Sequence, residues 1–417
     1  MTLYLARYLL PVTAPPVEDG AMLVRDGRIV AVGRRRDLQP GWKGETVDFG
    51  DAVILPPLVN CHTHLELTRF PDWVARAGET AAPGSFVDWI LHLIRIKGQQ
   101  GHDELRSSLE DGLLRSLQAG TGAVGDILSC PEALSAYRTS PLHGRFFLEI
   151  LGVETDLVLT RLDLLKTILD GGPIGCLKPG LAPHAPYTLS AGALARILSV
   201  ADCPLSIHFA ESAEECEFLQ RAAGAIAEKL YPRVGWGGRI PEPAGLRPTT
   251  WLDAGGLLTR KPLLVHGVHV SRDEADLLGR QGVTVVLCPR SNARLQVGHA
   301  PVEHYRAAGV SLALGTDSLA SSPSLSIWDE LAFADHLFGA SLSPADLLAM
   351  ATVNGARGLG LEGEMGALEP GWGEHFQVLK APSWPPSREL EALLCSRGGG
   401  LAGGHLFLAG RQVLQSN

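Results

Sequence analysis

The chain has 417 residues, of which 45% are hydrophobic and 19% are charged, so it is long enough to bury a large core. Its formal net charge of −9 disfavours nucleic acid and membrane partners, because both normally require a basic face. Seven cysteines without a CxxC pair predict reduced thiols and a cytoplasmic location. No apolar run is long enough to predict a signal or spanning segment. A small-molecule substrate fits this composition best.

The two ends of the chain differ from its middle. Residues 1–57 contain DGAMLVRDGRIVAVG, and residues 365–417 contain HLFLAGRQV. Both patterns predict short strands joined by glycine turns. We expect the two segments to pair as one small β-sandwich.

The middle, residues 58–364, predicts an α/β fold. Eight short apolar runs alternate with helical stretches, which indicates parallel strands joined by crossover helices and favours a (β/α)8 TIM-like barrel. A doubly wound open sheet would need a GxGxxG turn after an early strand, and none occurs there. The Gly- and Pro-rich stretch 232–248 predicts a surface loop near the substrate entrance. The runs are VILPPLVN, TGAVGDI, GRFFLEILG, IGCLKPGLAP, CPLSIHF, KPLLVH, VTVVLCP and VSLALGT.

Metal-binding residue types stand at the C-terminal ends of these runs, where barrel enzymes place their active sites. His62 and His64 alternate on the first predicted strand, so both imidazoles point the same way. His208 ends the fifth run and Asp317 follows the eighth. Three imidazoles and one carboxylate suit one divalent ion, which we expect to be zinc, with ferrous iron as the alternative.

Proton-transfer groups accompany these candidate ligands. Glu211 follows His208 by three residues and can act as a general acid and base, unless it only begins the next helix. His266, at the end of the sixth run, can orient the attacking water. Asp317 can accept a proton from that water as well as bind the metal.

A two-metal centre bridged by a carboxylated lysine is the competing arrangement. Lys178 lies near the end of the fourth run but precedes His184 by six residues. We therefore expect Lys178 to lie deeper in the strand than a ligand at the barrel mouth should, and we predict a single ion.

Motifs from almost the whole chain form one set: LPPLVNCHTHLE, GTGAVGDI, APHAPYTLS, SIHFAES, LLVHGVHV, CPRSNARL, GTDSLASSPSLSIWDE and ATVNGARGLGL. With them the chain resembles the chlorohydrolase and cytosine-deaminase-like branch of the amidohydrolase superfamily. The resemblance implies a metal-dependent deaminase of a heterocyclic amine, without an organic cofactor and often a homodimer. It also implies that His184 helps to hold the substrate and that Glu211 protonates the substrate ring.

Other members of this branch keep other activities open. S-adenosylhomocysteine or adenosine deaminase, guanine deaminase and triazine chlorohydrolase can use the same residues, and fold alone does not separate them. A metal-free barrel that serves as a structural partner is the remote alternative.

HLELTRF followed by GSFVDWILHLI resembles bacterial aminodeoxyfutalosine deaminases, which act on 6-amino-6-deoxyfutalosine during menaquinone synthesis. This resemblance leads us to expect a ribose contact from Glu66 and an apolar wall from Phe86 and Trp89. A salt-bridged glutamate and two core aromatics are the alternative. The benzoate of that substrate needs a cation, and Arg145 and Arg290 are the candidates.

Overall fold

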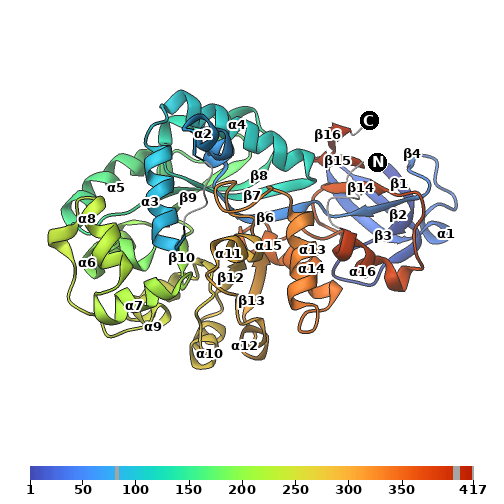
Figure 1. Ribbon diagram of the computed structural model, residues 1–417. Coiled ribbons are helices and arrows are strands. Elements are labelled where there is room, and N and C mark those ends of the chain that lie inside the picture. The colour runs from blue at the N-terminus through green and yellow to red at the C-terminus, as the bar shows by residue number, and fades with distance from the viewer. Residues whose placement is uncertain (80–83, 398–403, 416–417) are drawn as a thin grey trace.

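The computed structural model describes residues 1–79, 84–397 and 404–415. Its centre is a barrel of parallel strands with helices outside, as the alternating pattern predicts (Figure 1). Each predicted run supplies one strand, because its β-rich apolar residues are buried on both faces. The strands are β6 (Leu58–Thr63), β7 (Thr121–Leu128), β8 (His143–Ile150), β9 (Leu177–Pro183), β10 (Ser206–Phe209), β11 (Leu263–His266), β12 (Thr284–Leu287) and β13 (Ser311–Leu314).

Two groups of four strands, β6 to β9 and β10 to β13, join into the ring. On one side, the Leu181 N–H donates to the Pro204 carbonyl at 3.0 Å. On the other, the Asp317 N–H donates to the His62 carbonyl at 3.1 Å. Gly315 permits this second approach, because a Cβ there would lie 2.8 Å from the Cβ of His62. The barrel is therefore closed by two of the predicted site residues.

Serine residues are the N-caps of several outer helices. Ser85, Ser190, Ser212 and Ser271 each accept a hydrogen bond from the backbone N–H three residues later. Such caps satisfy a free donor at the helix start. The helices are α1 (Arg35–Leu38), α2 (Phe70–Arg76), α3 (Phe86–Lys97), α4 (His102–Gln118), α5 (Thr155–Asp170), α6 (Ala191–Val200), α7 (Ala213–Arg221), α8 (Tyr231–Arg233), α9 (Pro248–Ala254), α10 (Arg272–Gln281), α11 (Pro289–Leu295), α12 (Val302–Ala307), α13 (Ile327–Phe338), α14 (Pro344–Met350), α15 (Val353–Gly358) and α16 (Ser387–Arg397).

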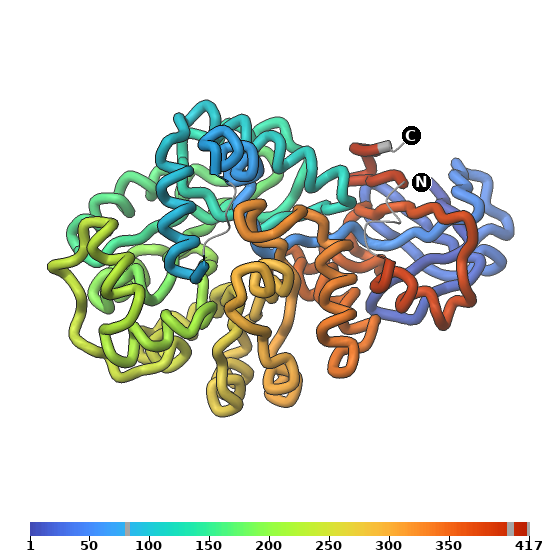
Figure 2. The backbone as a smooth tube through the Cα atoms, in the orientation of Figure 1, coloured from blue at the N-terminus to red at the C-terminus, as the bar shows by residue number. Residues whose placement is uncertain are grey.

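Strands from both ends of the chain form a second sheet. β5 pairs antiparallel with β14, so the first and last parts of the chain lie side by side (Figure 2). Along the sheet the order is β16-β15-β14-β5-β1-β2-β3, and β4 pairs with β1. The predicted pairing of the two ends is confirmed. These strands are β1 (Thr2–Leu9), β2 (Val17–Arg25), β3 (Arg28–Arg34), β4 (Glu45–Asp48), β5 (Ala52–Leu55), β14 (Phe376–Lys380), β15 (Gly404–Leu408) and β16 (Arg411–Gln415).

This terminal sheet encloses an apolar interior of its own. Tyr4 on β1 and Phe407 on β15 have ring centroids 6.3 Å apart, although two strands separate β1 from β15 in the sheet order. Phe49 and Phe376 complete the aromatic layer. The contact between Tyr4 and Phe407 shows that the sheet curves, as the predicted sandwich requires. The C-terminal helix α16 packs instead on α13 and α14 of the barrel. The domain limits at residues 57 and 365 stay a prediction.

Two features bear on the expectations from composition. All seven cysteines fall in the described ranges and carry free thiols. Among the described residues, no helix is both long and apolar enough to cross a membrane.

Candidate metal and active site

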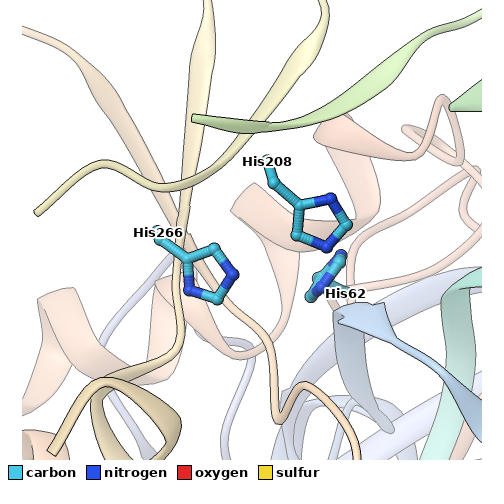
Figure 3. A group of neighbouring side chains, drawn as sticks. All are labelled: His62, His208 and His266. Atoms are coloured by element: carbon cyan, nitrogen blue, oxygen red, sulfur yellow. The ribbon is translucent and has the colours of Figure 1, made fainter. Parts of the chain in front are cut away.

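The predicted metal ligands come together at the C-terminal end of the barrel. His62 on β6, His208 on β10 and His266 on β11 direct their rings toward one point (Figure 3). His64 follows β6, and its Nε2 lies 3.2 Å from Nε2 of His208. Asp317 Oδ1 lies 3.6 Å from Nε2 of both His62 and His64. The structure thus gathers four candidate ligands from three strands.

These distances fit a shared metal ion. Ligands bound to zinc at 2.0–2.1 Å in a tetrahedron lie about 3.3 Å apart. Both ring nitrogens of His62 and the Nε2 of His266 are buried without a hydrogen-bond partner in the described part of the chain. Burial lowers the pKa of His64 and His208 well below the ordinary value, so both rings are neutral and offer a lone pair. Lys178 is exposed at the amino end of β9 and does not reach this cluster.

Hydrogen bonds fix which nitrogen two of these histidines present. The Nδ1–H of His208 donates to the carbonyl of His184 at 2.9 Å, which leaves its Nε2 free toward the cluster. Nδ1 of His266 lies 3.0 Å from Oδ1 of Asn292 and donates to it, so its Nε2 is an acceptor.

Asp317 is held by donors on its second oxygen. Ser291 Oγ and Ser321 Oγ each donate to Oδ2 at 2.7 Å, which leaves Oδ1 toward the histidines. Burial by itself raises the pKa of Asp317, but its contacts with His62 and His64 outweigh that effect and hold the pKa well below the ordinary value. Asp317 is therefore ionised at neutral pH.

The backbone turns sharply where these strands end. His266 has φ 75° and Asp317 has φ 59°, both in the left-handed region that side chains other than glycine rarely occupy. Such conformations persist where the surroundings fix them, and they gather at functional sites. Here they turn the two side chains into the barrel mouth.

Glu211 faces the same cluster from the loop after β10. It precedes Ser212, the N-cap of α7, so the alternative that it begins the helix is wrong. Its backbone N–H donates to Oε2 of Glu215 at 3.0 Å, and its Oε1 lies 3.5 Å from Nε2 of His266. Burial, followed by the charge of Asp317, raises the pKa of Glu211 well above the ordinary value. The raised pKa favours the protonated form of Glu211, as a general acid requires.

A cavity of about 510 Å³ opens above the cluster. Phe86 and Trp89 on α3 line it, so the predicted aromatic wall is present. His184 lies beside the cluster, with its ring centroid 4.9 Å from that of His208, and contacts Thr188 at 3.0 Å. The segment after α8 contributes Trp236, in agreement with a loop near the entrance. Further apolar lining comes from Leu67, Ile90, Leu93, Leu151, Tyr187, Leu230 and Val234.

Neither predicted arginine reaches this cavity. Arg145 stands near the amino end of β8, at the opposite end of the barrel, where it donates to the carbonyls of Leu359 at 2.8 Å and Pro179 at 3.2 Å. Arg290 lies 3.8 Å from the buried carboxylate of Glu330 and does not line the cavity. The expectation that one of them binds a substrate carboxylate is wrong.

Glu66 does not contact the cavity either. It is fully buried, and its carboxylate accepts hydrogen bonds from the N–H groups of Ser129 at 3.2 Å and Cys130 at 3.1 Å. It also forms an ion pair with Lys97, whose side chain does line the cavity. The salt-bridged alternative is correct, and the expected ribose contact from Glu66 is wrong.

Several residues of the site escape the sequence analysis. Ser291 and Asn292 belong to the CPRSNARL motif but have no predicted role, and only the fold shows that they hold Asp317 and His266. Glu149 could have been found, because it stands near the C-terminal end of a predicted strand. Lys97 ends a helix and carries no local signal.

Comparison with known proteins agrees with this geometry. The sequence profile of the Amidohydrolase family matches residues 53–396. The chain is 32% identical over 391 residues to an aminodeoxyfutalosine deaminase of Deinococcus radiodurans, and the aligned region covers 89% of this chain and 87% of the relative. It is 32% identical over 395 residues to a 5-methylthioadenosine/S-adenosylhomocysteine deaminase of Nitratidesulfovibrio vulgaris, and the aligned region covers 89% of this chain and 81% of the relative.

A solved structure shares the whole architecture. The crystal structure of an adenosine deaminase from Xanthomonas campestris with bound zinc superposes with a TM-score of 0.80 at 25% identity, over all of this chain and 93% of the other. The family profile spans most of the chain, and both relatives align with the chain over more than four fifths of their own length. The chain therefore belongs to the amidohydrolase family.

Proposed function

We propose that the protein is a metal-dependent hydrolase that removes the amino group from the base of a purine nucleoside. The observation that carries this proposal is the buried Glu211, whose pKa burial raises, facing a cluster of histidines and one aspartate inside a cavity of about 510 Å³. A reaction at a cyclic amidine needs an acid at the ring nitrogen and a base for water, and the site holds both. Nucleoside deaminases among the relatives support the same class.

One zinc ion is the cofactor that we propose. His62, His64, His208 and Asp317 would hold it, since their donor atoms already converge. When bound, the ion would supply Lewis-acid activation of water at the barrel mouth. The zinc in the adenosine deaminase from Xanthomonas campestris supports this choice of metal.

The side chains divide the proton transfers among them. Asp317 is ionised and accepts a proton from the attacking water. His266 offers Nε2 as an acceptor and orients that water. Glu211 gives its proton to the ring nitrogen next to the amino-bearing carbon, so the ring accepts the electron pair displaced by the new carbon–oxygen bond. Asp317 passes the proton taken from water to the amino group, and the carbon–nitrogen bond breaks to release ammonia. The hydroxyl on that carbon becomes the carbonyl of the product and returns a proton to Glu211.

The finer proposal is that the substrate is 6-amino-6-deoxyfutalosine, in a step of menaquinone synthesis. The relative from Deinococcus radiodurans supports it, and the relative from Nitratidesulfovibrio vulgaris supports 5-methylthioadenosine or S-adenosylhomocysteine to a similar degree. Lys97 is the one ammonium in the described lining of the cavity, where no arginine lies. A substrate carboxylate would therefore have to pair with Lys97 or extend to the cavity entrance.

Ammonia release by the zinc-loaded protein tests both levels of the proposal. The substrates are 6-amino-6-deoxyfutalosine, 5-methylthioadenosine, S-adenosylhomocysteine, adenosine and guanine, compared by kcat/KM. Glu211→Gln is the control for contaminating deaminases, and it should lower kcat/KM by about 10²- to 10⁴-fold while it leaves zinc content unchanged. Preference for another nucleoside refutes only the finer proposal. Absence of ammonia from every nucleoside refutes the deaminase itself.

A further inference from the structure

A polar patch made of Glu149 and Lys97 interrupts the apolar wall of the cavity. Glu149 is the seventh residue of β8, so its side chain emerges at the same end of the barrel as the metal cluster. It is half-buried and lines the cavity, yet its carboxylate has no hydrogen-bond or ion-pair partner within the described ranges. A carboxylate in such a place is an acceptor without a donor.

Lys97 supplies the donor of this patch. Its ammonium binds the carboxylate of Glu66 and the hydroxyl of Ser129, and these two contacts hold it in place. An ammonium has three N–H donors, so one remains for a ligand. The side chain is 20% exposed and lines the cavity. Burial acts to lower the pKa of Lys97, but the carboxylates of Glu66 and Glu149 outweigh it and leave the pKa raised.

The patch lies beside His184, which in turn lies beside the metal cluster. The charges of Glu149 and Lys97 both act on the pKa of His184, although burial is the larger effect and lowers it. The ring of His184 packs against that of His208. Glu149, Lys97 and His184 line the same cavity as the cluster, so they are within the space that a nucleoside with its base at the cluster would occupy.

We propose that Glu149 and Lys97 bind the two neighbouring hydroxyls of the nucleoside sugar, an inference that rests on the proposed nucleoside deaminase. A hydroxyl both donates and accepts, so one can donate to Glu149 and the other can accept from Lys97. An anionic group fits less well, because Glu66 already neutralises Lys97 and Glu149 repels a second carboxylate. The pair selects ribonucleosides over deoxynucleosides.

Binding of sugar analogues tests the assignment apart from turnover. The zinc-loaded Glu211→Gln protein serves as the parent, because it should bind nucleosides without consuming them. Calorimetry gives its Kd for adenosine, 2′-deoxyadenosine and 3′-deoxyadenosine. A hydrogen bond to a charged group predicts roughly ten- to hundredfold tighter binding of adenosine. In the parent with Glu149→Gln, this preference should fall to about threefold or less.

A matched control is Glu154→Gln in the same parent. Glu154 lies five residues further along the chain, has a side chain that is 41% exposed, and pairs with Arg239 outside the cavity, so the preference for adenosine should persist. The double change Glu66→Gln with Lys97→Met removes the buried ion pair as a unit and should also reduce the preference. Equal binding of all three nucleosides by the parent, or a preference that survives Glu149→Gln, overturns the assignment. Failure of the deaminase proposal shows separately, as missing ammonia release by the unmodified protein.

Discussion

Replacing Gly315 with alanine should loosen the metal site although no candidate ligand is itself replaced. Gly315 has an ordinary backbone conformation, so alanine introduces no strain of its own at φ. Its added Cβ, however, would lie 2.8 Å from the Cβ of His62 and 2.9 Å from the carbonyl oxygen of His62. That oxygen accepts the hydrogen bond from Asp317 that closes the barrel.

The size of the effect follows from these contacts. Ordinary contacts begin at 3.4 Å, so β13 has to move away from β6 by about half an ångström. Metal–ligand distances tolerate only about 0.2 Å. His62 and Asp317 lie on opposite sides of the moving contact, and we expect zinc affinity to fall about ten- to hundredfold. Overpacking of this kind also lowers the free energy of unfolding by about 1–3 kcal/mol.

Competition with a zinc chelator, together with thermal unfolding of the zinc-loaded protein, measures both effects. Gly238→Ala is the matched control, since a Cβ there meets no atom within 4 Å and should change neither quantity. If Gly315→Ala binds zinc as tightly as the unmodified protein, the close approach of β13 to β6 does not set the ligand geometry, and the reasoning fails.

Two further changes probe the surroundings of the site. Ser291→Ala removes one of the two hydroxyls that bind Asp317, so kcat/KM for the best nucleoside should fall about ten- to hundredfold. The control is Ser341→Ala, which removes a hydroxyl bound to Glu303 on the surface and should change kcat/KM less than twofold. Equal effects of the two changes would contradict the role of Ser291 in holding Asp317. Asp126 is buried, which raises its pKa to about 8, so the folded protein keeps a proton that the unfolded chain releases near pH 4, and stability falls as pH rises between these values. Asp126→Asn should flatten the fall in melting temperature between pH 5 and pH 8, and an unchanged slope would show that Asp126 is ionised in the folded state.

The sequence predicts the barrel well because the information is local. Each strand is a short run of apolar, β-branched residues, and the His62–His64 alternation is visible within one run. The rule that polar groups at strand ends meet at one face then brings His208, His266 and Asp317 together without knowledge of any contact.

The predictions for Arg145 and Glu66 are wrong because neither residue stands at the C-terminal end of a predicted strand in the way that the rule requires. Arg145 lies near the start of its predicted strand, so its position already places it at the far end of the barrel. That position is stronger evidence than the need of a carboxylated substrate for a cation. Glu66 and Lys97 are 31 residues apart, and nothing local to either predicts that they pair. Their contact depends on how α3 packs over the barrel, which is a tertiary property.

The pairing of β5 with β14 has a consequence for how the chain is made. β5 ends at Leu55, whereas its partner strand β14 begins only at Phe376. Ribosomes add about 5–20 residues per second, so the edge of β5 lacks that partner for on the order of tens of seconds during synthesis. An unpaired apolar edge is open to pairing with another chain. Nascent chains therefore pass through a period of aggregation risk that ends only when the last segment emerges, and truncation before β14 would make that state permanent.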